Sequence, residues 1–297
     1  MKFNNSKVLL GHQGSVLVVR FNNDGQYCLS GSQDKTIKLW NPSKELLIHT
    51  FSGHGYPVLD VKSSPDNNHI YSCAERQLYQ WDITSGETIR KFKGHSHTIN
   101  SIALNRDQSI LLSGSYDKSI KIWDLKSRNA DPIQVIEDAQ DSVTSVIVND
   151  DEFEIISCSV DGAIRIYDIR NGKLKYDQLN HALSSIYLTH DKKCLLVGAM
   201  NSSIQLLEKK TGDLLNDFSG HRNSIYKLNS CTVFDDSLVV SGSEDNDIYL
   251  WDIVEGNIVG RLKAHQNVVT SIDTHPKQHI VISASTDASI RYWDTQQ

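Results

Sequence analysis

The chain has 297 residues, a formal net charge of −6, 39% hydrophobic and 22% charged residues, a composition typical of a soluble globular protein. The acidic balance argues against nucleic-acid binding through bulk charge, and no apolar run approaches the roughly 18 residues of a membrane-spanning helix. The five cysteines include no C-x-x-C pair, which argues against a metal site and favours reduced thiols inside the cell.

The first forty residues after the N-terminal stretch predict four short strands separated by turns. Residues 15–21 are apolar and β-branched, and Asn22-Asn23-Asp24-Gly25 is a hairpin-turn signal. A second strand begins at residues 27–30, a third spans 36–40, and a fourth spans 46–51 after the turn Asn41-Pro42-Ser43. Four antiparallel strands of this kind make one propeller blade.

The same pattern returns along the whole chain. It closes at Trp40, Trp81, Trp123, Tyr167, Leu207, Trp251 and Trp293, at steps of 41, 42, 44, 40, 44 and 42 residues. Asp follows the Trp in four of the seven units. A Gly-His pair opens four units, which are not all the same ones: Gly11-His12, Gly53-His54, Gly94-His95 and Gly220-His221. This period and these pairs resemble the WD40 repeat. The resemblance implies an all-β, seven-bladed WD40 β-propeller that forms a single domain over residues 1–297.

The two ends of the chain predict how the ring closes. The short apolar run at residues 7–10 precedes the first Gly-His, and only three residues follow Trp293-Asp294. The last unit therefore lacks a fourth strand of its own. We expect residues near 7–10 to supply the outer strand of the last blade, which leaves only short, protected edges.

Four units carry a His, a Ser, an Asp and a Trp at regular positions. These sets are His12, Ser30, Asp34 and Trp40; His95, Ser113, Asp117 and Trp123; His221, Ser241, Asp245 and Trp251; and His265, Ser283, Asp287 and Trp293. In WD40 proteins such residues form a hydrogen-bond chain, in which each group satisfies a buried neighbour. A hydrolase triad is the alternative, but four copies at blade spacing favour a structural role, and no G-x-S-x-G, H-E-x-x-H or phosphate-binding motif is found.

Three units depart from this pattern. Unit 2 has Glu75 in place of Asp, in a turn one residue shorter. Unit 4 has Asp138-Ala139 for Gly-His and Tyr167 for Trp. Unit 5 has His181 out of register, Asn201 for Asp and Leu207-Glu208 for Trp-Asp, so we expect units 4 and 5 to lack the polar chain. Sequence drift held by packing and a softer sector that adapts to a partner are the two interpretations.

The loops with Gly-His and the turns with Asp are expected to share one face around a central channel. Candidate partner-binding residues there are Tyr56, Pro57, His97, Tyr116, Arg222, Tyr226, Glu244 and Gln266. Tyr and Arg are frequent interface hot spots, and an ordinary solvated loop residue is the alternative for each. Basic residues recur two positions before the Trp position, and we interpret them as solvated rather than as a nucleic-acid stripe: Lys38, Lys121, Arg165 and Arg291.

Several segments resemble the mitogen-activated-protein-kinase organizer family of WD-repeat proteins. The segments are residues 19–22, 24–29, 34–42, 52–56, 58–60, 211–215, 226–228, 243–245 and 251–256. The Trp40-Asn41-Pro42 and Gly53-His54-Gly55-Tyr56 stretches are not general features of WD40 repeats. The resemblance therefore spans nearly the whole chain and is more specific than the repeat.

The family resemblance implies a propeller without enzymatic activity, cofactor or metal. Family members are described as scaffolds that gather components of the MAP-kinase cascade and as proteins associated with the spliceosome in pre-mRNA splicing. The expected partners are accordingly kinase-cascade components and splicing factors, with no direct contact with nucleic acid or membrane. We expect a monomer located in the cytoplasm and the nucleus.

A substrate receptor of a cullin-type ubiquitin ligase is the alternative function. Asp161 and the run from Ile164 to Arg170 resemble the Trp-Asp-x-Arg box that docks propellers on cullin-ligase adaptors, with Tyr167 in place of Trp. Trp123-Asp124-Leu125-Lys126 is a weaker match. An enzyme with a site in the channel is a third, weaker interpretation, and would require groups with strongly perturbed pKa values there.

Overall fold

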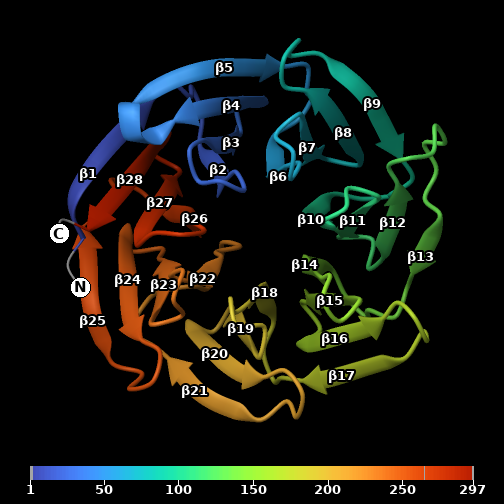
Figure 1. The fold of residues 1–297 in the computed structure, drawn as a ribbon. Coiled ribbons are helices and arrows are strands. Elements are labelled where there is room, and N and C mark those ends of the chain that lie inside the picture. The colour runs from blue at the N-terminus through green and yellow to red at the C-terminus, as the bar shows by residue number, and fades with distance from the viewer. Residues whose placement is uncertain (1–2, 264, 296–297) are drawn as a thin grey trace.

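The computed structural model describes residues 3–263 and 265–295, which form seven four-stranded antiparallel sheets arranged as blades around a ring (Figure 1). The predicted all-β, seven-bladed propeller is thus confirmed. In blades 1 to 6 the strands run in sequence order from the channel outwards. No helix of the described residues is long and apolar enough to cross a membrane.

The strand bounds follow the repeat closely. Blade 1 contains β2 (Val16–Phe21), β3 (Cys28–Ser32), β4 (Thr36–Asn41) and β5 (Leu46–Ser52), with a short 3-10 helix, η1 (Pro42–Lys44), before β5. Blade 2 contains β6 (Val58–Ser63), β7 (His69–Ala74), β8 (Gln77–Asp82) and β9 (Thr88–Lys93). Blade 3 contains β10 (Ile99–Leu104), β11 (Ile110–Ser115), β12 (Ile120–Asp124) and β13 (Gln134–Ile136), and blade 4 contains β14 (Val143–Asn149), β15 (Glu154–Ser159), β16 (Ala163–Asp168) and β17 (Leu174–Gln178).

The remaining blades complete the circle. Blade 5 contains β18 (Leu183–Leu188), β19 (Cys194–Ala199), β20 (Ser203–Glu208) and β21 (Leu214–Phe218). Blade 6 contains β22 (Ser230–Thr232), β23 (Leu238–Gly242), β24 (Asp247–Asp252) and β25 (Ile258–Lys263). Blade 7 contains β26 (Val269–Thr274), β27 (Ile280–Ser285), β28 (Ser289–Thr295) and, as its outer strand, β1 (Phe3–Leu10).

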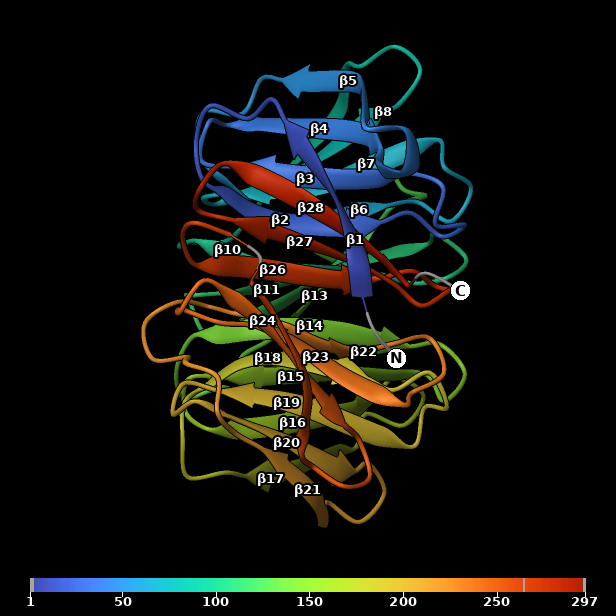
Figure 2. The same ribbon diagram turned by 90° about the vertical axis from the view of Figure 1, so that its left-hand side faces the viewer.

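The N-terminal strand closes the ring, as the sequence predicts. β1 pairs antiparallel with β28, with Lys7 opposite Tyr292 and Leu10 opposite Ser289, and Figure 2 shows the two strands side by side. Leu9 is buried in a cluster with Trp40 of blade 1 and Ile290 of blade 7. The strand therefore joins the first and last blades through both its backbone ladder and its apolar side chains.

The apolar core lies between successive blades. Blades 1 and 2 approach closely at Gly31, where an added Cβ would meet a methyl carbon of Val58 at 2.6 Å. Gly114 has the same relation to Val143 between blades 3 and 4, again at 2.6 Å. A side chain at either glycine would push two blades apart, which explains why the second strand of each of these blades carries a glycine.

Hydrogen bonds between the innermost strands supplement this packing. The carboxylate of Asp60 accepts from the N–H of Ile102 at 2.9 Å, and that of Asp273 accepts from the N–H of Phe21 at 2.7 Å. Between blades 5 and 6 the hydroxyls of Ser185 and Ser230 are buried and have no hydrogen-bond partner among the described residues. The junction of blades 5 and 6 is therefore the least well satisfied part of the inner ring.

Candidate functional site: the Gly-His face

The antiparallel order of the strands puts two sets of loops on one face of the ring. The loops that enter each innermost strand and the turns between the second and third strands form what we call the Gly-His face. The turns between the first and second and between the third and fourth strands form the opposite face. All eight candidate partner-binding residues lie on the Gly-His face.

In blade 1 the four predicted residues form a continuous hydrogen-bond chain. Trp40 Nε1 donates to Ser30 Oγ at 2.8 Å, and Ser30 Oγ lies 2.7 Å from His12 Nε2. His12 Nδ1 lies 2.7 Å from a carboxylate oxygen of Asp34. Because a carboxylate only accepts, His12 donates from Nδ1 and receives the Ser30 proton at Nε2.

Blades 3 and 7 repeat this chain. The Trp–Ser, Ser–His and His–Asp distances are 2.9, 2.7 and 2.8 Å for Trp123, Ser113, His95 and Asp117. They are 3.0, 2.8 and 3.1 Å for Trp293, Ser283, His265 and Asp287. Three of the four predicted sets are therefore assembled as expected.

The electrostatics of these chains fit a structural role. Burial alone would raise the pKa of Asp34, but hydrogen bonds from Thr36, His12 and the N–H of Gln13 together hold it at about 2. Burial lowers the pKa of His12 despite the carboxylate beside it. The hydroxyl of Ser30 is fully buried, accepts from Trp40 and gives its proton to a neutral imidazole. Such a hydroxyl is closed to substrate, so the chain stabilises the blade instead of forming a hydrolase triad.

Blade 2 retains half of the chain. Trp81 donates to Ser72 at 2.8 Å, and Ser72 lies 3.0 Å from His54 Nε2. His54 Nδ1 is buried without a partner among the described residues, because Glu75 stands in the shortened turn where other blades have Asp. Burial lowers the pKa of His54 to about 3.

The prediction for blade 6 is wrong, since its four residues are present but not joined. Both ring nitrogens of His221 are buried and find no hydrogen-bond partner within residues 3–263 and 265–295, and Ser241 donates to the carbonyl oxygen of Gly242 at 3.0 Å. Trp251 donates to the carbonyl oxygen of Ser219 at 2.9 Å, while Asp245 accepts from Tyr249 at 2.6 Å. The cause is spacing: His221 precedes Ser241 by twenty residues, whereas the hydrogen-bonded His–Ser pairs of the other blades are eighteen apart.

Two of the basic strand residues are also buried, contrary to the solvated interpretation. Arg165 donates to Ser159 Oγ at 2.7 Å and to a carboxylate oxygen of Asp161 at 2.8 Å. Lys38 is buried as well and donates to Thr50 Oγ1 at 2.9 Å. Blade 4 thus lacks the His–Ser–Trp chain but contains an Arg–Asp–Ser network in its place.

The longer loop of blade 6 is the most distinctive feature of the Gly-His face. One carboxylate oxygen of Glu244 accepts from the N–H groups of Ser224, Ile225 and Tyr226 at 2.8, 2.6 and 2.9 Å, and the other accepts from Ser224 Oγ at 2.8 Å. Burial would raise the pKa of Glu244, but these backbone donors hold it at about 2. Glu244 is therefore a fixing group for the loop and not a free partner-binding side chain.

This loop presents apolar groups to solvent and reaches across the channel. Ile225 is 72% exposed and Tyr226 is 42% exposed. Lys227 donates from Nζ to the backbone oxygen of Asn100 in blade 3 at 2.6 Å. Lys227, which follows Tyr226 in this loop, therefore reaches across the channel to the innermost strand of blade 3.

The other candidates are distributed over the same face. His97 and Tyr116 of blade 3 form an edge-to-face pair with ring centroids 5.8 Å apart, and Tyr116 is 60% exposed. Arg222 Nε lies 3.6 Å from the Oε2 carboxylate oxygen of Glu244. Tyr56 and Gln266 are exposed and Pro57 is half-buried. Sequence reasoning missed Ile225, although the two extra residues before Ser241 mark the loop that carries it.

Comparison with known proteins shows to which family the chain belongs. A family model described as nucleolar protein 10-like, N-terminal domain, matches residues 59–241, and the model of the WD domain, G-beta repeat, matches residues 3–41 and 256–294. The WD repeat domain-containing protein 83 homolog of Dictyostelium discoideum is 42% identical over the full length of both chains. The chain belongs to the WD repeat domain-containing protein 83 family.

Vertebrate relatives extend this similarity. WD repeat domain-containing protein 83 of Mus musculus is 41% identical over 97% of this chain and 90% of the relative, and that of Homo sapiens is 42% identical over 95% and 89%. This is the MAP-kinase organizer family that the sequence segments resemble. WD40 propellers of this kind are generally non-catalytic and mediate protein–protein interactions.

Proposed function

We propose that the protein is a scaffold that holds two or more partner proteins at once and so raises their effective concentration. The proposed partners are components of the MAP-kinase cascade, splicing factors that act in pre-mRNA splicing, or both. The support for these partners is the family resemblance, and we propose a monomer in the cytoplasm and the nucleus as the working form.

The observation that carries the proposal is the exposed apolar surface of the blade 6 loop on the Gly-His face. Glu244 fixes the backbone of the loop that displays Ile225 and Tyr226, so the loop conformation that presents these side chains is set before a partner arrives. Tyr116 offers an exposed aromatic ring on the facing blade. Preordered aromatic and apolar groups near the centre of a face are typical hot spots, because little conformational entropy is lost when they bind.

The test is affinity purification of the tagged full chain from nuclear and from cytosolic extracts, followed by mass spectrometry. The wild type is compared with Ile225→Glu and with a matched control, Val254→Glu, whose side chain is 80% exposed on the opposite face. We expect kinases in the cytosolic fraction or splicing factors in the nuclear fraction, recovered by the wild type and the control and lost with Ile225→Glu.

Other outcomes separate the alternatives. Recovery of the protein only as a free monomer contradicts a scaffold. Partners that are retained by Ile225→Glu contradict this surface but not the scaffold. Recovery of a cullin-ligase adaptor that is lost on changing Arg170 to Ala favours the ligase receptor. Arg170 is exposed, and among the described residues its one ion pair is with Asp168, at 3.3 Å between Nη2 and a carboxylate oxygen.

A further inference from the structure

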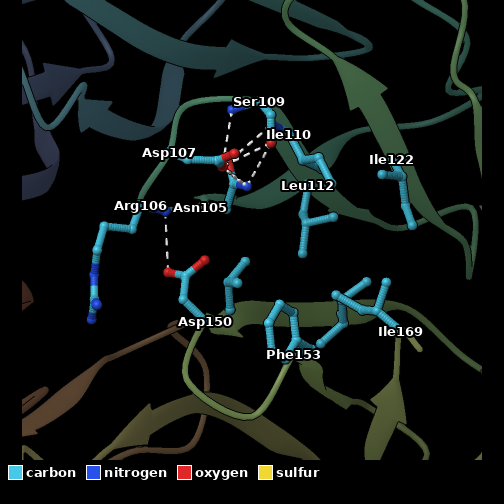
Figure 3. Close-up of a pocket in the computed structure, with 12 residues that line it drawn as sticks. Asn105, Arg106, Asp107, Ser109, Ile110, Leu112, Ile122, Asp150, Phe153 and Ile169 are labelled. Carbon is cyan, nitrogen blue, oxygen red and sulfur yellow. Dashed lines mark hydrogen bonds between the residues drawn. The ribbon is translucent and has the colours of Figure 1, made fainter. Parts of the chain in front are cut away.

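A second surface lies on the opposite face, in the crevice between blades 3 and 4 (Figure 3). The crevice has a volume of about 460 Å³, which lies in the range of pockets that bind ligands. Its floor consists of Leu112, Ile122, Val148 and Ile155, and Phe153 and Ile169 form its wall. We call this feature the blade 3–4 groove.

The groove is long as well as apolar. A second depression of about 300 Å³ shares Ile122, Ile155 and Ile169 with it and continues along the outer side of the two blades to Glu137 and Asp138. The outer strand of blade 3, β13, has only three residues, compared with seven in β5 and six in β9. An extended opening of this shape suits a chain segment better than a compact small molecule.

The corresponding site between blades 1 and 2 is smaller, about 280 Å³. Tyr27 in blade 1 and Ile110 in blade 3 occupy equivalent strand positions. Each immediately precedes the residue that pairs, in the neighbouring strand, with the Trp of its blade. The larger phenol ring fills part of the space. The opening between blades 3 and 4 is therefore wider than its counterpart between blades 1 and 2.

Phe153 is held in a conformation that is unfavourable for its residue type. Its φ is 57°, in the left-handed region that bulky side chains rarely adopt. The left-handed residues in the same turns of other blades are glycine or polar: Gly25, Asn67, Gln108, Lys192 and Asp236. The ring is 52% exposed and its centroid lies 5.3 Å from the guanidinium carbon of Arg170, so burial offsets only part of the strain. Residues held in strained backbone conformations concentrate at binding sites.

The charges around the groove indicate the kind of occupant. Five carboxylates and one arginine line the two connected depressions: Asp107, Asp150, Glu137, Asp138, Asp168 and Arg106. Arg170 forms an ion pair with Asp168, and Lys126 Nζ lies 3.8 Å from a carboxylate oxygen of Asp107. Among the described residues, no cation pairs with Asp150, Glu137 or Asp138. The rim therefore retains negative charge beside an apolar floor.

We propose that the blade 3–4 groove binds a short segment of a partner protein in which apolar residues are flanked by lysine or arginine. The apolar side chains fill the space over Ile122 and Ile155, against Phe153. The basic side chains face Glu137, Asp138 and Asp150. This inference rests on the proposed scaffold role, to which it adds a second surface that begins on the opposite face and runs along the outer side of blades 3 and 4 to the loop before β14.

The test uses purified full-length protein and a random 12-residue phage-displayed peptide library. Selected peptides are synthesised with a fluorophore, and their affinity is measured by fluorescence anisotropy. We expect two or more apolar residues next to lysine or arginine, and an affinity that falls as salt increases. Phe153→Glu and the double variant Glu137→Lys/Asp138→Lys should each weaken binding by about tenfold or more, whereas the control Val254→Glu should bind as the wild type does.

Several results overturn the proposal. These are failure to select any peptide, peptides without basic residues, or equal binding by Phe153→Glu. A dimer in light scattering that Phe153→Glu dissociates would assign the groove to a second copy of the chain instead. Ile225→Glu should bind the peptides normally, so a failure of the groove is distinguishable from a failure of the Gly-His face.

Discussion

Lys227 of blade 6 donates a hydrogen bond to the backbone oxygen of Asn100 in blade 3, at 2.6 Å, although 127 residues separate them in sequence. The bond fixes one end of the blade 6 loop, and Glu244 fixes its middle. The surface that we propose for partner binding is thus held from two sides of the channel.

Replacing Glu244 by Gln should loosen this loop. The carboxylate receives three backbone N–H bonds, and charged acceptors of this kind contribute about 1.5–3 kcal/mol each at most, so we expect a loss of that order in total. The folded pKa of about 2 lies below the ordinary value of 4.5, so the contribution is present above about pH 4.5 and is lost as the pH falls towards 2. Urea unfolding of wild type and variant at pH 7 and pH 3 measures it. An equal difference at both pH values would contradict this assignment.

The hydrogen-bond chains predict unequal costs for the same substitution. Ser30→Ala removes the partner of both Trp40 and His12, and each buried group left unsatisfied costs about 1–3 kcal/mol. Ser241→Ala removes only a bond to Gly242 and should cost no more than about 1 kcal/mol. Chemical denaturation of the two variants tests the difference, and equal losses would mean that the blade 6 chain does form in solution.

His54 should make the fold sensitive to acid. Its folded pKa of about 3 lies below the ordinary value of 6.5, so the unfolded chain takes up the proton first, and stability falls as the pH drops from about 6.5 towards 3. His54→Gln should flatten this part of the pH profile. The measurement is the free energy of unfolding from pH 4 to pH 8, and an unchanged slope in the variant would assign the acid sensitivity to other groups.

Closure by β1 predicts that an N-terminal deletion destabilises the ring. Removing residues 1–10 should lower the melting temperature, because it exposes the edge of β28 and removes Leu9 from the core. Leu9→Ala alone should cost about 2–5 kcal/mol. Leu10→Ala, at a position 71% exposed, is the control and should change stability by less than about 0.5 kcal/mol. A deletion variant with the same melting temperature as the wild type would show that the strand contributes nothing to the stability of the ring.

Hydrogen exchange should be fastest at the junction of blades 5 and 6. The inner strand β22 has three residues, and the hydroxyls of Ser185 and Ser230 have no hydrogen-bond partner in the described part of the chain, whereas blade 4 has the Arg165–Asp161 network. The softer sector that the sequence suggests for units 4 and 5 would then be displaced towards blade 6. Uniform protection around the ring would support drift without softening.

Much of the fold can be predicted from the sequence because each repeat is defined by residues that lie close together along the chain. The spacing of His12, Ser30 and Trp40 within one unit is enough to predict both a blade and its hydrogen-bond chain. The blade 6 chain fails because two extra residues after His221 displace it, an effect that residue identity does not reveal.

The blade 3–4 groove depends on distant residues, which explains why no motif indicates it. Its size follows from Ile110 in one blade, its wall from Phe153 in the next, and its charge from Glu137 in the connection between them. The burial of Arg165 is likewise set by Ser159 and Asp161 in the neighbouring strand and turn. Strand periodicity cannot distinguish such a buried cation from a solvated one.

The pairing of β1 with β28 also orders events during synthesis on the ribosome. β1 emerges from the ribosome before its partner, Ser289–Thr295, which follows nearly three hundred residues later. Until then β1 is a free edge that another nascent chain on the same message could pair with. Accurate production of this ring therefore depends on keeping one short strand unpaired until the last blade has been made.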